Sequence, residues 1–135
     1  MPQFRKHPVT HEWVVIATER GKRPSDFKRD ELPPRPEYSE KCPFCPGHED
    51  QTPPEVLAYR PPETSPNTPG WSIRVVSNKF PALQIEGDLD RQGVGMYDFM
   101  NGVGAHEVII ETTRHDRQIG NIPPELAVDV WQAAK

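Results

Sequence analysis

The chain has 135 residues, the size of one ordinary domain, with 34% hydrophobic residues and 17 prolines. Its net charge is −4, from 16 basic and 20 acidic residues, and this argues against general binding to nucleic acid, which needs a strongly basic surface. The sequence contains no apolar run long enough to cross a membrane and no apolar segment of a secretory signal. We therefore expect a cytoplasmic protein that binds neither nucleic acid nor membranes.

The first predicted strand covers residues 12–17, a compact run of β-branched and aromatic residues that ends just before a basic turn. Twelve of the prolines then lie between Pro24 and Pro69. Proline lacks the amide donor and disfavours helix in the residue before it, so we expect residues 24–70 to form a long irregular loop. Something other than hydrophobic burial must hold such a loop in place.

Three further strands are predicted from alternation and from β-branched residues, at residues 71–76, 83–86 and 106–112. Residues 87–104, which contain five glycines, are expected to form a loop. The run that begins at His106 is the strongest strand signal in the chain.

The last predicted element is a helix that starts at Pro123 or Pro124, where a missing amide hydrogen does no harm. One apolar face follows the helical repeat and consists of Ala127, Val130, Trp131 and Ala134. The pattern reaches Lys135 without a glycine cap or another stop signal. We therefore expect the chain to be a fragment whose helix face packs against a partner surface.

Cys42 and Cys45 have the Cys-x-x-Cys spacing, in which two thiolates can bind one tetrahedral zinc ion. A redox motif with this spacing normally opens a helix, whereas here prolines flank both cysteines and no helical pattern follows. The context favours a metal site, and two free thiols in a loop are the alternative. A structural zinc site needs four ligands, so this pair alone is incomplete.

Three histidines are candidates for a further ligand. His48 follows Cys45 closely, and His106 shares a strand face with apolar residues, which suits a hydrogen-bonded core or interface histidine better. His115 follows the strongest strand, where an imidazole can turn toward a metal held by a neighbouring loop, and Asp116 beside it is a possible partner of such a ring. Spacing alone leaves the choice among the three open.

Two polar turns are candidates for binding a nucleotide. Arg20 and Arg23 carry guanidinium groups, which bind phosphate in a bidentate fashion. Asn78 and Lys79 lie in a turn between two predicted strands, where their side chains can recognise a base, a ribose or a phosphate. Taken singly, each turn is more often an ordinary surface loop.

In this order along the chain, the motifs resemble those of galactose-1-phosphate uridylyltransferases from about residue 7 to the end. The matching segments are residues 12–16 with 20–24, 42–47, 74–83 and 104–111 followed by His115. The resemblance implies an α+β fold of the histidine-triad superfamily. Such a fold has a mixed, mostly antiparallel sheet with a packed helix, here with a long proline-rich, zinc-bearing loop.

The resemblance also implies a reaction. The complete enzyme exchanges UMP between UDP-glucose and galactose 1-phosphate through a uridylyl-histidine intermediate, which splits one displacement into two. It implies a homodimer, and a zinc ion bound by Cys42, Cys45, His115 and a histidine near the nucleophile. The positions at or near the nucleotide are Arg20, Arg23, Asn78 and Lys79.

The sequence departs from this family pattern in one respect, because it has no His-x-His segment, which holds the family's nucleophile. We therefore expect residues 1–135 to be an amino-terminal domain that is inactive alone, with water or His48 as fourth zinc ligand. An ADP-glucose phosphorylase-like adenylyltransferase is an alternative, since plant-type enzymes of that kind share the Cys-x-x-Cys, Asn-Lys-Phe-Pro and Gly-x-His-Glu-Val patterns. A second alternative is a non-catalytic binding module stabilised by zinc.

Overall fold

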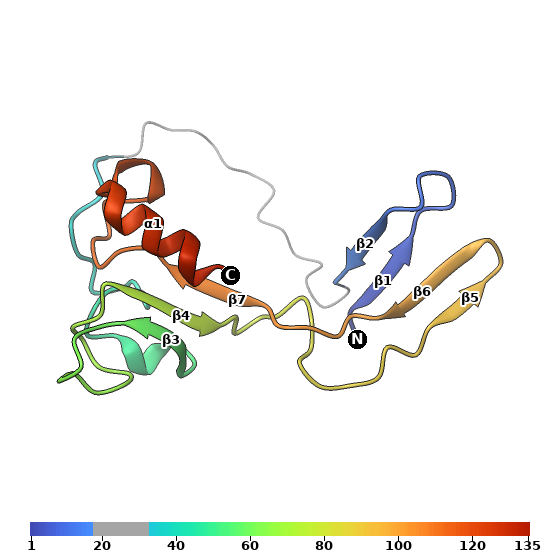
Figure 1. Ribbon diagram of the computed structural model, residues 1–135, viewed down its shortest axis with the longest axis horizontal. Helices are drawn as coiled ribbons and strands as arrows, with labels where there is room; N and C mark the ends of the chain where they lie inside the picture. Colours follow the sequence, from blue (N-terminus) through green and yellow to red (C-terminus); the bar gives the residue numbers. More distant parts are fainter. Residues whose placement is uncertain (18–32) are drawn as a thin grey trace. The chain divides into compact units, whose positions relative to one another are not determined.

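The computed structural model describes residues 1–17 and 33–135, which divide into two compact units (Figure 1). Unit 1 consists of residues 1–17 and 80–106, and unit 2 of residues 33–79 and 107–135. The basic turn with Arg20 and Arg23 lies outside the described residues. Neither the ten-residue helix α1 nor any other described helix has the length and apolar character that a bilayer span requires.

Unit 1 is a four-stranded antiparallel sheet in the order β2-β1-β6-β5. Its strands are β1 (Gln3–Lys6), β2 (Trp13–Ile16), β5 (Gln92–Val94) and β6 (Tyr97–Asn101). The strand predicted at residues 12–17 is confirmed as β2, whose residue Trp13 lies opposite Lys6 of β1.

The expected loop at residues 87–104 is wrong, because β5 and β6 form a hairpin there. Val94 pairs with Tyr97, so Gly95 and Met96 alone make the connection. Gly95 has a φ of +61°, while Met96 does not have a positive φ, as in a type II′ turn. The strand expected at residues 83–86 is also wrong, since it is reduced to one isolated bridge between Gln84 and Val103.

Unit 2 is built on a three-stranded antiparallel sheet with β4 at its centre. Its strands are β3 (Glu55–Tyr59), β4 (Ile73–Ser77) and β7 (Glu107–Ile110). The strands expected at residues 71–76 and 106–112 are thus confirmed as β4 and β7. The expectation of an irregular region over residues 24–70 is wrong for β3, which contains no proline.

The hydrophobic core of unit 2 lies around β4. Trp71, Val76 and Ile110 form a buried cluster, with Ala58 and Val108 packed against it. The charged residue of β4 also lies inside, since Arg74 is only 1% exposed. The centre of this sheet is therefore covered on both faces.

Arg74 is buried with polar partners from the segments around β3. Its Nε donates to Glu55 at 3.1 Å, and its terminal nitrogens donate to Thr52 Oγ1 at 2.8 Å and Asn67 Oδ1 at 3.3 Å. Glu55 also accepts from Arg60 at 2.6 Å. Because buried charges need such partners, this network fixes the proline-rich segment after β3 against the sheet.

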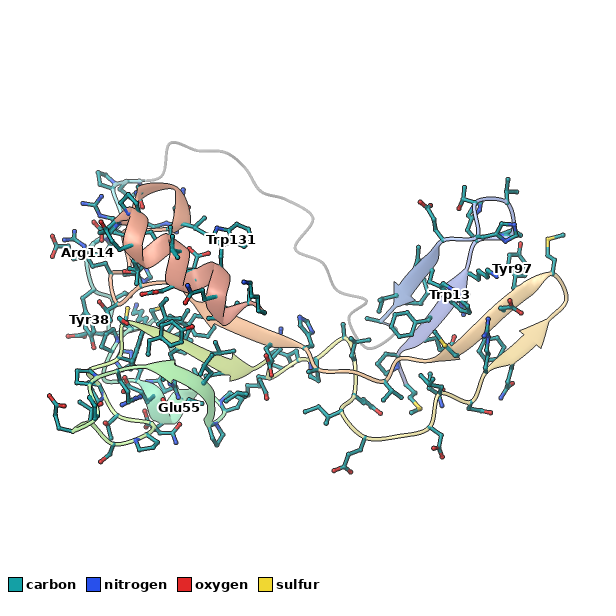
Figure 2. The ribbon with its side chains drawn as sticks, viewed as in Figure 1. Trp13, Tyr38, Glu55, Tyr97, Arg114 and Trp131 are labelled. Carbon is teal, nitrogen blue, oxygen red and sulfur yellow. The ribbon has the colours of Figure 1, made fainter. Side chains whose placement is uncertain are left out.

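Helix α1 (Pro124–Ala133) starts at the predicted proline and completes unit 2 (Figure 1). Its residue Val130 is only 5% exposed, whereas Trp131 is 67% exposed (Figure 2). The predicted apolar face is therefore only partly right. The described residues also form two short 3-10 helices, η2 (Glu49–Gln51) and η3 (Ile119–Asn121). Antiparallel sheets with one helix confirm the α+β class.

Candidate metal centre

Three potential metal ligands meet in unit 2. The Sγ atoms of Cys42 and Cys45 and a ring nitrogen of His115 all lie within 4.8 Å of one another. The two cysteines come from the proline-rich loop, while His115 follows β7. Spacing left three histidines open as the further ligand, and the fold brings His115 to the cysteines.

The geometry of this group fits zinc. Cys45 Sγ lies 3.6 Å from His115 Nδ1. In a tetrahedral site with a Zn–S bond of about 2.3 Å and a Zn–N bond of about 2.05 Å, sulfur and nitrogen ligands stand about 3.6 Å apart. A thiolate pair with an imidazole is also a donor set that suits zinc. The group can therefore supply three of the four ligands of a structural zinc site.

The loop reaches this arrangement through three successive turns. The amides of Cys42, Cys45 and His48 donate to the carbonyl oxygens of Ser39, Cys42 and Cys45, at 3.1, 3.3 and 3.2 Å. No α-helix opens at the cysteines, as it would in a Cys-x-x-Cys redox motif, and η2 is the element that follows. The local structure thus resembles a metal-binding turn more than a redox motif.

Cys45 is the more enclosed of the two thiols, at 4% exposure. Burial raises the pKa of its thiol above the ordinary value, and the neighbouring Cys42 adds to this effect. Only the thiolate binds a metal, so metal binding must displace the proton of this thiol.

Glu37 holds the segment of His115 against the loop. The amide of His115 donates to the carbonyl oxygen of Glu37 at 2.8 Å, and Arg114 donates to the Glu37 carboxylate at 2.8 Å. Arg114 also donates twice to Asp116, at 2.9 and 2.7 Å, and this guanidinium holds the pKa of the Asp116 carboxyl below its usual range. Asp116, which the sequence offered as one candidate partner of an imidazole, therefore pairs with Arg114.

Glu49 connects the metal-binding turn to the core, a role that the sequence did not suggest. Glu49 is 7% exposed, and its carboxylate accepts from Trp71 Nε1 at 2.8 Å and from the amide of Gly47 at 2.9 Å. Since Trp71 belongs to the hydrophobic cluster beside β4, the end of the turn is tied to the sheet. An acidic residue two positions after a glycine was the one available signal.

The other two candidate histidines do not lie in the cluster. His48 places its Nδ1 2.6 Å from the carbonyl oxygen of Cys42 and its Nε2 3.1 Å from the Tyr38 hydroxyl. His106 accepts from the amide of Ala82 at 2.8 Å, which confirms the expected hydrogen-bonded role. Sequence reasoning missed Tyr38 entirely, because its contact depends on how the loop folds.

Of the predicted nucleotide-binding residues, the structure describes Asn78 and Lys79, and these lie apart from the metal cluster. Asn78 and Lys79 directly follow β4, and Asn78 is half-buried while Lys79 is exposed. Ser77 pairs with Glu107 at the start of β7, whereas His115 follows the end of β7. Asn78 and the metal cluster therefore lie at opposite ends of this sheet.

Comparisons with known proteins place the chain. No family model matches it. It is 38% identical over 99% of its length to ADP-glucose phosphorylase from Arabidopsis thaliana, and it covers 37% of that protein. The chain also matches the crystal structure of an ADP-glucose phosphorylase from Arabidopsis thaliana with bound ADP-glucose, with 34% identity and a TM-score of 0.52. This match covers 99% of the present chain and 36% of the chain in that structure.

A uridylyltransferase structure matches the chain with 26% identity and a TM-score of 0.57. This match covers 97% of the present chain and 33% of the chain in that structure. The chain thus spans about a third of the length of these relatives. The fold and these neighbours define an α+β protein of the histidine-triad superfamily. The sequence identity and these neighbours confirm the resemblance to the galactose-1-phosphate uridylyltransferase family that the sequence motifs show.

Proposed function

We propose that the chain is part of a nucleotidyltransferase that acts on a nucleotide sugar, and that this substrate is ADP-glucose. The supporting observation is the 38% identity to an ADP-glucose phosphorylase over 99% of the chain. Identity to the uridylyltransferase structure is lower, at 26%. This difference favours the adenylyl alternative over the exchange of UMP between UDP-glucose and galactose 1-phosphate.

In this proposal Cys42, Cys45 and His115 hold a zinc ion. The ion would link the proline-rich loop to the segment after β7, two parts of unit 2 that are far apart in the sequence. Zinc in a structural site takes four ligands, so a fourth comes from outside the cluster. In the family pattern it is a histidine near the nucleophile. The metal would then connect this unit directly to the reaction centre.

The nucleotide would be bound by Asn78 and Lys79, together with Arg20 and Arg23. The amide of Asn78 has donors and an acceptor that suit a ribose or a base, and the ammonium of Lys79 suits a phosphate. Lys79 is exposed at the end of β4, where a ligand can reach it. A phosphate group needs such cationic partners because its charge is costly to desolvate.

The transfer itself would use a histidine nucleophile, as the family pattern implies. No His-x-His segment occurs among the 135 residues, so we expect the chain alone to catalyse no transfer. The homodimer and the cytoplasmic location belong to the same proposal for the complete enzyme. A binding module without catalysis is the alternative from another class.

The test compares two substrate pairs in the protein expressed from its complete reading frame. ADP-glucose with inorganic phosphate is assayed beside UDP-glucose with galactose 1-phosphate, and the proposal expects turnover with the first pair. The same nucleotide sugar should raise the melting temperature, because it binds the native state. Lys79→Ala should raise KM for it, whereas Lys41→Ala, an exposed lysine beside Cys42, should not.

Each other outcome has a clear meaning. Turnover of UDP-glucose with galactose 1-phosphate would replace the adenylyl proposal by the uridylyl alternative. Protein that binds zinc but turns over neither pair would favour the non-catalytic binding module. An unchanged KM in Lys79→Ala would remove that residue from the proposed nucleotide site.

A further inference from the structure

His48 lies beside the metal-binding turn, and neither of its ring nitrogens belongs to the metal cluster. Its Nδ1 is 2.6 Å from the carbonyl oxygen of Cys42, and its Nε2 is 3.1 Å from the hydroxyl of Tyr38. The Tyr38 and His48 rings are tilted by 44°, with centroids 5.7 Å apart. The imidazole is thus fixed by contacts at both nitrogens and on its ring.

The partners determine where the proton of this imidazole lies. A backbone carbonyl oxygen only accepts hydrogen bonds, so Nδ1 must carry the hydrogen and donate to Cys42. In a neutral ring Nε2 is then an acceptor, and the Tyr38 hydroxyl donates to it. Tyr38 thereby favours the one tautomer of His48 that can hold the Cys42 carbonyl.

The carbonyl of Cys42 has a second donor, because the amide of Cys45 points at the same oxygen from 3.3 Å. The hydrogen bond from the Cys45 amide is long, so the shorter hydrogen bond from His48 is the stronger of the two. Together they fix the peptide plane that follows Cys42. This plane sets the direction of the turn, and with it the position of the Cys42 thiol relative to Cys45.

We propose that His48, oriented by Tyr38, is a positioning residue of the metal centre. It acts through the carbonyl of Cys42 and holds the turn in its metal-binding conformation before the metal arrives. Preorganisation of this kind strengthens binding because less ordering remains to be done when the ion binds. The inference rests on the proposed zinc site.

The test measures zinc affinity of the 135-residue chain by competition with a chromophoric chelator. Removal of a residue that orients metal ligands typically weakens affinity about 10- to 100-fold, so His48→Ala should lose at least about tenfold. His48→Asn should stay within about threefold of wild type, because its side-chain amide can donate from the place of Nδ1. Tyr38→Phe should fall between the two.

His7→Ala is the matched control. The Nδ1 atom of His7 also makes hydrogen bonds, accepting from the amides of Val9 and Thr10, but this residue lies in unit 1. Its removal should leave zinc affinity unchanged. Melting temperatures in excess chelator show whether each metal-free variant is folded, and His48→Asn and Tyr38→Phe carry the test if His48→Ala is not.

Cobalt spectra distinguish a positioning role from ligation. With Co²⁺ in place of zinc, the variants should show the wild-type absorption bands at a higher metal concentration, because their ligands are unchanged. Altered bands in His48→Ala or His48→Asn would make His48 a ligand and overturn the inference. Wild-type zinc affinity in His48→Ala would overturn it as well.

The experiment gives a different result if the proposed zinc site itself is wrong. In that case the wild-type chain binds no zinc, and the inference falls with the site before any variant is compared. If instead wild type binds zinc, Cys42→Ser abolishes binding, and His48→Ala has no effect, the site stands and only the role of His48 is refuted.

Discussion

Cys45 Sγ and His115 Nδ1 lie 3.6 Å apart, although the two residues are 70 positions apart in the sequence. The contact closes a loop that contains the five strands β3 to β7. Glu37 closes nearly the same loop through its hydrogen bonds to the His115 amide and to Arg114. Tyr38 and Arg114 lie at the end of unit 2 that holds this centre (Figure 2). A metal ion at this contact would therefore reinforce a junction that the backbone already makes.

The first prediction concerns metal content. Purified chain should contain close to one zinc ion, and both Cys42→Ser and His115→Ala should lose it, because each removes one of three clustered ligands. Metal analysis of the purified proteins measures this. His106→Ala is the control, since that ring accepts from Ala82 in unit 1 and should not affect zinc. Full zinc content in His115→Ala would show that another residue is the third ligand.

The second prediction concerns removal of the metal. A ligand that binds only the folded state stabilises it by about 2.7 kcal/mol when its free concentration is 100 times the dissociation constant. A chelator should therefore lower the melting temperature of the zinc-loaded chain, by a shift on the order of 10 °C for a chain of this length. Cys42→Ser should melt at the same temperature with and without chelator. If the chelator lowered the melting temperature of Cys42→Ser as much as that of the zinc-loaded chain, it would not be acting by removing this zinc ion.

The strands and the helix could be predicted where side-chain pattern decides the structure. The runs at β2, β4 and β7 are rich in β-branched residues, and Pro124 marks the start of α1. The β5–β6 hairpin was missed because its glycines look like a loop, while pairing with β1 makes β6 a strand. β3 was missed because prolines surround it without lying in it.

The site was predictable to a different degree for each residue. Cys42 and Cys45 form a local motif, so the sequence alone indicates them. His115 followed from the family resemblance, since spacing could not separate it from His48 and His106. Tyr38 has no sequence signal at all, because its contact with His48 exists only once the three turns of the loop have formed.

The third prediction concerns the buried charges beside β4. The carboxylate of Glu55 forms ion pairs with Arg60 at 2.6 Å and with Arg74 at 3.1 Å. All three side chains are at most 10% exposed. Glu55→Gln leaves two buried guanidinium groups without a counter-charge and should cost roughly 3 kcal/mol of unfolding free energy. Urea denaturation measures it. Glu63→Gln, an exposed glutamate in the following loop, should stay within about 0.5 kcal/mol. Equal costs in both variants would argue against a buried network.

The last prediction separates two neighbouring residues of α1. Val130 is 5% exposed and Trp131 is 67% exposed, although both belong to the apolar face expected from the sequence. Val130→Ala removes two buried carbon groups and should cost roughly 1.5 kcal/mol, at about 0.8 kcal/mol for each. Trp131→Ala should cost less than about 0.5 kcal/mol in the same urea denaturation, because it removes exposed surface. A cost for Trp131→Ala that equals that of Val130→Ala and rises with protein concentration would mean that a second chain covers the Trp131 ring in solution.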